Sequence, residues 1–510
     1  MLMTHPGLPW AWGVTVWIFM TLVTVRALLR RSVAPAAAPR YPLTRVPVLG
    51  PLIRRATRSP WPLVVLRVLV VALFLLVIVS GLAGTPIPER NLATALTWNL
   101  WWAGLIISVF FLGSAWCAVC PWDTLAGWLV KRRLWRRAPP ERSLGLRVPR
   151  RLRNVIPALI LFIGLTWLEL GVGVTTSPYA TASLALLMVV LATASLAIFE
   201  RKAFCRYFCP VGRTVGFYAQ LAPVELRPVD ASVCARCTTL DCYHGTERIE
   251  PCPTHLVMGR ITQNTYCTSC GNCAQACPWE NVAWRLRPPS TEAIQEARPH
   301  WDEAWFMLGL LALTLFHGIT MMPFWESWTG SVARWLGDSG QLLWTFTTGL
   351  LLSLAIPIAV YGAAVWLTHR LARPALPPGR LFARLAFLAV PLAFAYHLAH
   401  NLNHLVRESA GVGALFANPL GIGAQPLSMA EKHARHFHLL IPEWLLFALQ
   451  AGLMMAGFYI AVQVITHRGR GLAADGGDLP PRRLAPMLAF ALLVNGTGLW
   501  LLMQPMVMRM

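Results

Sequence analysis

Long runs of apolar residues alternate with short polar segments along most of this chain. Ten of these runs are close to the ~20 residues that an α-helix needs to cross a bilayer. They cover residues 9–29, 62–83, 96–116, 154–174, 179–199, 303–324, 342–367, 381–404, 439–466 and 485–504. One long polar stretch, 200–302, follows the fifth run. The pattern predicts an all-α polytopic membrane protein of about ten transmembrane helices, in which a domain at 200–302 separates two five-helix halves, 1–199 and 303–510.

Composition agrees with a membrane protein and decides how the net charge is interpreted. Of the 510 residues 56% are hydrophobic and 13% are charged, whereas a soluble protein carries about 25% charged residues. A net charge of +22 suggests nucleic-acid binding in a soluble protein. Here the basic residues gather in short segments between apolar runs, as the positive-inside rule describes. We therefore predict contact with the lipid bilayer of a bacterial-type inner membrane and no nucleic-acid partner.

The basic segments predict which side of the membrane each loop occupies. Arginine-rich segments follow the first, third, seventh and ninth runs, and the segments between them carry few or balanced charges. This bias places both termini outside and residues 200–302 in the cytosol. A reducing cytosol keeps thiols free to bind metal, which suits the 12 cysteines of the chain.

The inserted segment contains eight cysteines in two groups. Residues 267–278 read C-x2-C-x2-C-x3-C-P, the ligand run of a bacterial-type 4Fe–4S ferredoxin, in which three cysteines hold one cluster and the fourth binds the partner cluster. We predict one 4Fe–4S cluster on Cys234, Cys237, Cys242 and Cys277, and a second on Cys252, Cys267, Cys270 and Cys273. Zinc, which prefers paired C-x2-C knuckles, and disulfides are the alternatives.

Two further cysteine pairs lie at helix ends on the same predicted face. Cys117 and Cys120 precede Pro121, and Cys205 and Cys209 precede Pro210. Proline ends a helix and turns the backbone, which leaves the thiols at the membrane surface. We predict that the four cysteines share a third centre, an iron–sulfur cluster, a lone metal ion or a redox dithiol. Buried free cysteines without a metal are the structural alternative.

These motifs together resemble the NapH/NosR-type membrane polyferredoxins. The resemblance covers about residues 60–290 and rests on the apolar helices, the Cys-Arg-Tyr-Phe-Cys-Pro-Val-Gly-Arg stretch at 205–213 and the ferredoxin segment. It implies a membrane-bound iron–sulfur protein that moves electrons between the quinone pool or cytosolic donors and a respiratory enzyme outside. The chain departs from the family in its first pair, C-x2-C-P instead of C-x3-C-P, and in its second five-helix half.

Histidines gather on the predicted outer side of the C-terminal half. His397, His400 and His404 share one face of the eighth run. The others are His317 in the sixth run and His433, His436 and His438 before the ninth. Axial histidines on different helices would bind b-type haem, and histidines beside methionines would suit copper. A quinone pocket or hydrogen-bonded helix-end residues are the alternatives.

The predicted function is electron transfer across the membrane. The hydrocarbon core, ~30 Å thick, is too wide for one tunnelling step, so we expect relay centres between the cytosolic clusters and a quinone, haem or metal site near the outer face. Glu169, an ionisable residue of the fourth run, would accept a quinol proton or pair with a neighbour. The enzyme class would be a quinol dehydrogenase-type component with a redox partner protein. Copper reduction for an extracytoplasmic metalloenzyme is the alternative.

Overall fold

The computed structural model describes residues 4–29, 39–132, 143–338, 343–409, 411–437, 439–473 and 477–507. Within these ranges nine helical segments are long and apolar enough to cross a membrane, in agreement with a helical multi-pass protein. They are α1 (Trp10–Leu29), α3 (Trp61–Ala83), α4 to α5 (Leu92–Leu112), α9 (Pro178–Ile198), α14 (Trp301–Thr320), α16 (Leu343–Ala372), α17 to α18 (Pro378–Glu408), α21 (Glu443–Arg468) and the segment Pro481–Met503 that contains α22 (Ala485–Met503). The tenth predicted span is α8 (Ile156–Gly171), whose 16 residues are fewer than a full crossing requires.

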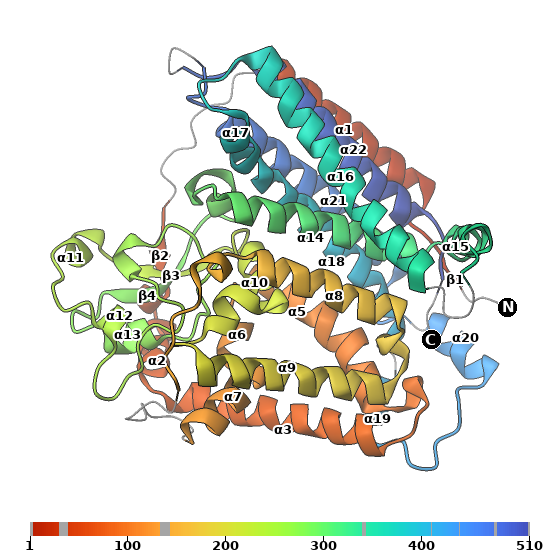
Figure 1. Cartoon of the computed structure of the whole chain (residues 1–510), viewed down its shortest axis with the longest axis horizontal. Helices are drawn as coiled ribbons and strands as arrows, with labels where there is room; N and C mark the ends of the chain where they lie inside the picture. Colours follow the sequence, from red (N-terminus) through yellow and green to blue (C-terminus); the bar gives the residue numbers. More distant parts are fainter. Residues whose placement is uncertain are drawn as a thin grey trace.

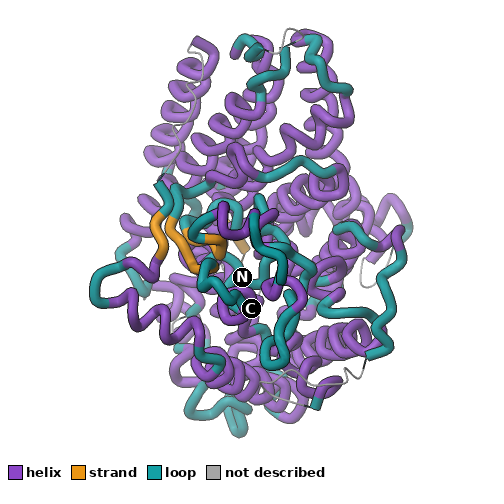
Figure 2. Tube along the Cα trace, turned by 90° about the vertical axis from the view of Figure 1, so that its left-hand side faces the viewer, coloured by secondary structure: helices purple, strands orange, loops and turns teal. Residues whose placement is uncertain are grey.

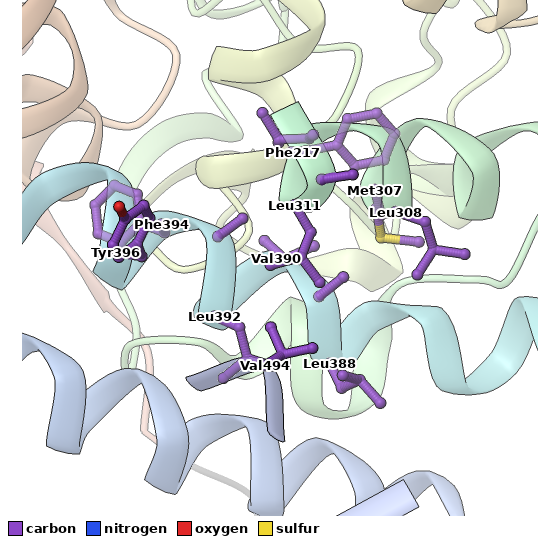
Figure 3. Packing of buried hydrophobic residues seen from close by; sticks show 14 of the residues in the cluster. Phe217, Met307, Leu308, Leu311, Leu388, Val390, Leu392, Phe394, Tyr396 and Val494 are labelled. Atoms are coloured by element: carbon purple, nitrogen blue, oxygen red, sulfur yellow. The ribbon is translucent and has the colours of Figure 1, made fainter. Parts of the chain in front are cut away.

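The long helices differ in how much of their apolar surface is buried inside the protein. In α14 and in α17 to α18, 83% of the apolar window is buried, against 17% in α1. Leu311 of α14 lies beside Val390 of α18 (Ala389–Glu408) among the buried hydrophobic side chains (Figure 3). The packed core therefore lies around α14 and α18, and the helices around it present leucine and valine outward, which favours a membrane protein.

Short elements complete the fold. The remaining helices are α2 (Leu49–Arg58), α6 (Trp116–Val119), α7 (Pro121–Lys131), α10 (Pro210–Tyr218), α11 (Ala231–Ala235), α12 (Asp241–His244), α13 (Asn272–Ala276), α15 (Pro323–Leu336), α19 (Val412–Leu415) and α20 (Met429–Phe437). The strands are β1 (Thr4–His5), β2 (Tyr41–Pro42), β3 (Val224–Pro228), β4 (Val282–Leu286) and β5 (Met506–Val507). The cysteine-rich segment, which contains α11, α12 and α13, lies at one end of the protein, and both chain termini lie toward the other end (Figure 1).

A small antiparallel sheet supports the cysteine-rich segment. Its order is β2-β4-β3, and β3 pairs with β4 in a register that places Leu226 opposite Trp284. Figure 2 shows these strands grouped beside the loops of the cysteine-rich segment. Strand β2 comes from the connection between the first two predicted spans, and the following helix α2 packs on α13. Residues 39–58 thus join the segment that the sequence limited to 200–302.

The two predicted five-helix halves are not separate in space. Helix α1, which belongs to residues 1–199, packs against α21 and α22 of the C-terminal half (Figure 1). Strand β1 pairs with β5, so that Thr4 lies opposite Val507. Helices α8 and α14 also pack on each other across the boundary. The division at residue 199 therefore describes the order of the chain, whereas the packed helices form one body.

Candidate functional site

The thiols of the ferredoxin segment influence one another's pKa in sets that follow the two predicted groups only in part. Burial raises the pKa of the Cys242 thiol, and the nearby thiols of Cys234, Cys237 and Cys277 raise it further. Burial likewise raises the pKa of the Cys273 thiol, to which Cys270, Cys267 and Cys252 contribute, as does Cys242 of the other predicted group. All 12 cysteines are free thiols in the structure. The cluster-binding roles themselves stay a prediction.

Backbone and amide N–H groups point at the sulfur atoms of both groups. In the second group, Leu256 N donates to Cys252 Sγ at 3.2 Å and Ser269 N to Cys267 Sγ at 3.4 Å. In the first, Asn281 N donates to Cys277 Sγ at 3.4 Å and Asn281 Nδ2 to Cys234 Sγ at 3.5 Å. Hydrogen bonds of this kind favour the thiolate over the thiol. The residues present therefore fit a negatively charged thiolate centre in each group.

The loop around Cys270 takes its shape from two residues with positive φ. Ser269 has φ 50° and Gly271 has φ 78°. A Cβ at Gly271 would lie 3.0 Å from the Trp284 ring of β4, so glycine allows the loop to turn tightly and to pack on the sheet. The two turns separate Cys267, Cys270 and Cys273, the last of which lies on the short helix α13.

The two helix-end cysteine pairs also converge. Cys117 lies in α6 and Cys205 in a π-helical turn (Phe204–Phe208), while Cys120 and Cys209 immediately precede α7 and α10. Burial raises the pKa of Cys117 to about 12, with a further contribution from Cys209 of the other pair. Burial also raises the pKa of Cys205, to which Cys209 and Cys120 contribute. The four thiols thus lie within electrostatic range of one another, with Cys209 buried and the other three half-buried. We call this group the membrane-face site.

Charged residues surround the membrane-face site. Lys202 Nζ donates to Asp123 Oδ2, and Cys205 Sγ lies 3.7 Å from Asp123 Oδ1. Burial by itself lowers the pKa of Lys202, but the attraction of Asp123 outweighs it and raises the pKa above its usual value. Gly212 N donates to Cys209 Sγ at 3.2 Å, so the thiol caps the N-terminus of α10. Helix N-termini and cations both favour a thiolate.

The membrane-face site touches the second ferredoxin group directly. The Oγ atoms of Ser114, before α6, and Ser269, between Cys267 and Cys270, lie 2.9 Å apart. Arg213 of α10 donates to Thr265 O at 2.6 Å. Gly216 brings the backbone of α10 so close to Thr265 that a Cβ would lie 2.1 Å from its carbonyl oxygen. The segment that leads to Cys267 is therefore packed against the helix that Cys209 caps.

A lone metal ion and a 4Fe–4S cluster make different demands on cysteine sulfurs. A lone zinc ion draws four sulfurs to ~2.3 Å from one point. In a 4Fe–4S cluster each iron takes one cysteine, which spaces the sulfurs more widely. Across the part of the chain that the structure describes, no three His, Cys, Asp or Glu side chains are placed to hold one metal ion. The choice between a cluster and a lone ion at each cysteine site stays a prediction.

Three of the predicted histidines line one small cavity between helices. His317 of α14 and His397 and His400 of α18 surround a space of about 30 Å³ together with Glu169 of α8 and Trp102 of α5 (Trp102–Leu112). The rings of His317 and His400 have centroids 5.2 Å apart at an interplanar angle of 79°. The sequence placed His317 and Glu169 on other spans than His397 and His400, and the fold brings these spans together.

A second, larger cavity adjoins this one. It measures about 90 Å³, shares Trp102 and Glu169 with the first, and is lined mainly by tryptophans and aliphatic side chains. Pro210 and Val211, the first residues of α10, form part of its wall. The two cavities therefore extend from the membrane-face site to the histidines. Their lining is apolar apart from a few hydroxyl groups, the histidines and Glu169.

The histidine geometry disfavours haem. A haem between two axial imidazoles needs room for a macrocycle between the rings, but His317 and His400 are in T-shaped contact beside a cavity of about 30 Å³. His404 Nδ1 lies 2.8 Å from Glu408 Oε1, one turn farther along α18. The side chains of His433 and His436, and all of His438, lie outside the described residues. A polar pocket is the interpretation of the histidines that fits this arrangement.

Helix α10 connects the two sites and supplies residues that the sequence did not single out. It begins after Cys209 and ends at Tyr218, whose Oη lies 3.1 Å from His397 Nδ1. The Tyr218 ring also makes an edge contact with the His397 ring at 5.9 Å. Helical spacing from Cys209 would have placed Arg213 on the same face one turn on, but only the tertiary fold shows that Tyr218 reaches α18.

Comparisons with known proteins agree with iron–sulfur binding. A family model described as "4Fe-4S binding domain" matches residues 94–139 and 179–222, which contain the two cysteine pairs of the membrane-face site. The Escherichia coli protein named "Putative electron transport protein YccM" is 27% identical over 143 residues, 27% of this chain and 37% of its own length. An uncharacterized protein of Methanocaldococcus jannaschii is 24% identical over 216 residues, 41% of this chain and 78% of its own length. No solved structure matches the chain.

These findings establish the general character of the protein. The family match assigns 4Fe–4S binding to the segments around α5 to α7 and α9 to α10, and the helices agree with a multi-pass membrane location. The match between this chain and the E. coli protein spans about a third of that relative, 37% of its length. The resemblance to the NapH/NosR type, the quinone and the respiratory partner stay predictions.

Proposed function

We propose that this protein is a membrane-bound electron-transfer protein, in which the two ferredoxin groups and the membrane-face site each hold a 4Fe–4S cluster. Bound clusters of this kind supply one-electron chemistry. The observation that carries the proposal is the direct contact between Ser114 and Ser269, because it joins the membrane-face cysteines to the ferredoxin segment. The role that the name of the E. coli relative gives it agrees with this function.

The cavities beside α10 support a quinone-type acceptor or donor at the other end of the relay. A quinone head group is a flat ring with two carbonyl oxygens that take up protons when the ring is reduced. The tryptophan-lined cavity offers apolar walls for the faces of such a ring, and Glu169 lies at its edge. Glu169 and His397 are placed to exchange a proton with an oxygen of the bound ring, while Tyr218 orients His397 through Nδ1. Ionisable residues inside a membrane protein commonly mark such sites.

The test is iron content followed by turnover with a soluble quinone. Anaerobically purified protein should contain about twelve iron atoms per chain, about four for each of the three clusters. After reduction with dithionite, a short-chain ubiquinone analogue should reoxidise it. Glu169→Gln should slow this reoxidation by about tenfold or more with unchanged iron, whereas Glu326→Gln, an exposed carboxylate of α15, should not. Zinc in place of iron would contradict the proposal.

We also propose that the ferredoxin segment faces the cytosol. Arg54, Arg55 and Arg58 lie on α2 beside the cysteine-rich segment, at the end of the protein opposite the two termini (Figure 1). Reporter fusions within 214–300 should therefore be active in the cytosol, and fusions after residue 420 and at residue 510 should be active outside. A ferredoxin segment outside the membrane would overturn this part, because its thiols would meet an oxidising compartment.

A further inference from the structure

Arg213 is the most deeply buried charged side chain next to the membrane-face site. Its exposed fraction is 1%, and it lies one helical turn after Cys209 on α10. One guanidinium nitrogen donates to Thr265 O at 2.6 Å, and the guanidinium carbon lies 4.8 Å from the centre of the Tyr266 ring. The buried Nε atom has no hydrogen-bond partner among the described residues. A backbone oxygen and an aromatic face are weak compensation for a buried cation.

Two other buried arginines, both on the sheet side of the ferredoxin segment, are paired with a carboxylate, whereas Arg468 of α21 is held by the backbone oxygens of Ala293 and Ala297. Arg227 and Arg287 are 5% and 3% exposed, and both form ion pairs with Glu292. In the described chain Arg213 takes part in no such pair, although its burial is deeper. A buried cation without an anion costs several kcal/mol, so the site of Arg213 is built for a negative charge that comes from something other than a carboxylate.

The thiols of the membrane-face site can supply that charge, and one of them is close in space. Arg213 N donates to Cys209 O at 3.1 Å, so the two residues are neighbours on one face of the first turn of α10. Burial raises the pKa of Cys117 and of Cys209, and Arg213 acts in the opposite direction on both. Arg213 therefore lies within electrostatic range of one cysteine from each pair. A 4Fe–4S cluster with four thiolate ligands carries a net negative charge, which becomes larger on reduction. The guanidinium and such a cluster would balance each other.

We infer that Arg213 is the counter-charge of the membrane-face cluster and that it raises the reduction potential of this cluster relative to the two ferredoxin clusters. The inference rests on the proposed function, because it requires a cluster at this site. A fixed positive charge stabilises the reduced form, which carries one more electron, and hence favours reduction. Arg213 is a positioning residue in this role, since its charge acts on the cluster electrostatically and its helix, α10, begins directly after the ligand Cys209.

The test is a potentiometric titration of anaerobically purified protein, followed by electron paramagnetic resonance. Arg213→Gln should shift the midpoint of the membrane-face cluster to lower potential, so that its reduced-to-oxidised ratio at a fixed potential falls about tenfold, or about 59 mV for one electron. Arg213→Lys retains the charge and should remain near the wild-type midpoint. Arg260→Gln, an exposed arginine of the ferredoxin segment, is the matched control. An unchanged midpoint in Arg213→Gln would overturn the inference.

A second measurement applies if Arg213→Gln fails to assemble the cluster. In a Cys117→Ser chain, which lacks the cluster, Arg213 is an uncompensated buried cation, so Arg213→Met should raise the thermal unfolding temperature. In the cluster-loaded wild-type background the same substitution should lower it. If Arg213→Met changes the thermal unfolding temperature in the same direction in both backgrounds, Arg213 only packs against Thr265. Absence of any reducible iron signal in the wild type would instead refute the proposed function.

Discussion

The ferredoxin segment and the membrane-face site place cysteines around a centre in two different ways. In the ferredoxin segment Cys267, Cys270 and Cys273 lie close in sequence, separated by tight turns at Ser269 and Gly271. At the membrane-face site Cys117 and Cys205 come from separate segments that meet through packing of α7 on α9 and of α5 on α10. A local motif can thus specify its ligands alone, whereas the membrane-face site depends on the surrounding helices.

The electrostatic surroundings of the two sites differ as well. Cys237 lies near the surface, and the pKa of its thiol is lowered, chiefly by a hydrogen bond from the Leu240 backbone. At the membrane-face site burial raises the pKa of every cysteine. The charged side chains of Lys202 and Arg213 act against this increase. Surface exposure suits exchange of electrons with a soluble partner, and burial suits transfer into the membrane helices.

The largest expected effect is the selective loss of one centre on cysteine substitution. Cys205→Ser should remove about four iron atoms per chain, because a hydroxyl replaces a thiolate in a site that four cysteines share. The matched variant Cys270→Ser should remove a similar number from the ferredoxin segment. Iron analysis and electron paramagnetic resonance of each variant check this. Loss of all iron from Cys205→Ser alone would show that the membrane-face site supports the ferredoxin segment and is not independent of it.

The next effect is a contrast in thiol reactivity after the iron is removed with a chelator. Iodoacetamide reacts with thiolates, and a pKa of about 12 leaves Cys117 about a thousandfold less ionised than an ordinary cysteine. A thiolate of high pKa is more nucleophilic, and this offsets part of the difference in alkylation rate. Cys237, whose pKa is lowered, should therefore be alkylated at least about thirtyfold faster at pH 8.

The pH dependence separates the two thiols further. Labelling of Cys237 should reach half of its maximal rate below pH 9, the ordinary value from which its pKa is lowered, and should level off above that point as the thiol becomes fully ionised. Labelling of Cys117 should continue to increase up to its pKa of about 12. Peptide mass spectrometry of samples quenched at several times measures both rates. Similar rates for the two cysteines would mean that the membrane-face site opens to solvent without its metal.

The sequence was sufficient where structure follows from a local pattern. Apolar length predicted the helices, although α8 is shorter than its run. The assignment of the eight ferredoxin cysteines to two clusters by the C-x2-C-x2-C-x3-C-P run stays a prediction. The sequence was insufficient where distant segments meet. The strand β2 at Tyr41–Pro42, the contact of Tyr218 with His397 and the burial of Arg213 all arise from tertiary packing, which spacing along one helix does not encode.

A smaller effect should follow from disturbing the contact between the two sites. In Gly216→Ala the new Cβ would lie 2.1 Å from Thr265 O, a backbone atom that has little room to move. Overpacking of this kind costs about 1–3 kcal/mol. Gly127→Ala on α7, where nothing lies within 4 Å of the new Cβ, should be neutral or stabilising by up to about 1 kcal/mol. Thermal unfolding in detergent compares the two variants, and equal stability would argue against tight packing of α10.

The smallest expected effect concerns the far end of α10, where Tyr218 Oη lies 3.1 Å from His397 Nδ1. Tyr218→Phe removes this buried hydrogen bond and leaves the imidazole nitrogen without it, which should cost about 1 kcal/mol of stability. Tyr396→Phe is the matched control, because the buried Tyr396 Oη has no hydrogen-bond partner in the described part of the chain. That substitution should therefore be neutral or slightly stabilising. If Tyr218→Phe slows reoxidation by the quinone analogue and Tyr396→Phe does not, His397 depends on α10 for its orientation. Equal effects of the two substitutions on stability and on rate would mean that α10 ends in ordinary packing, and that only its first turn, beside the membrane-face site, serves the relay.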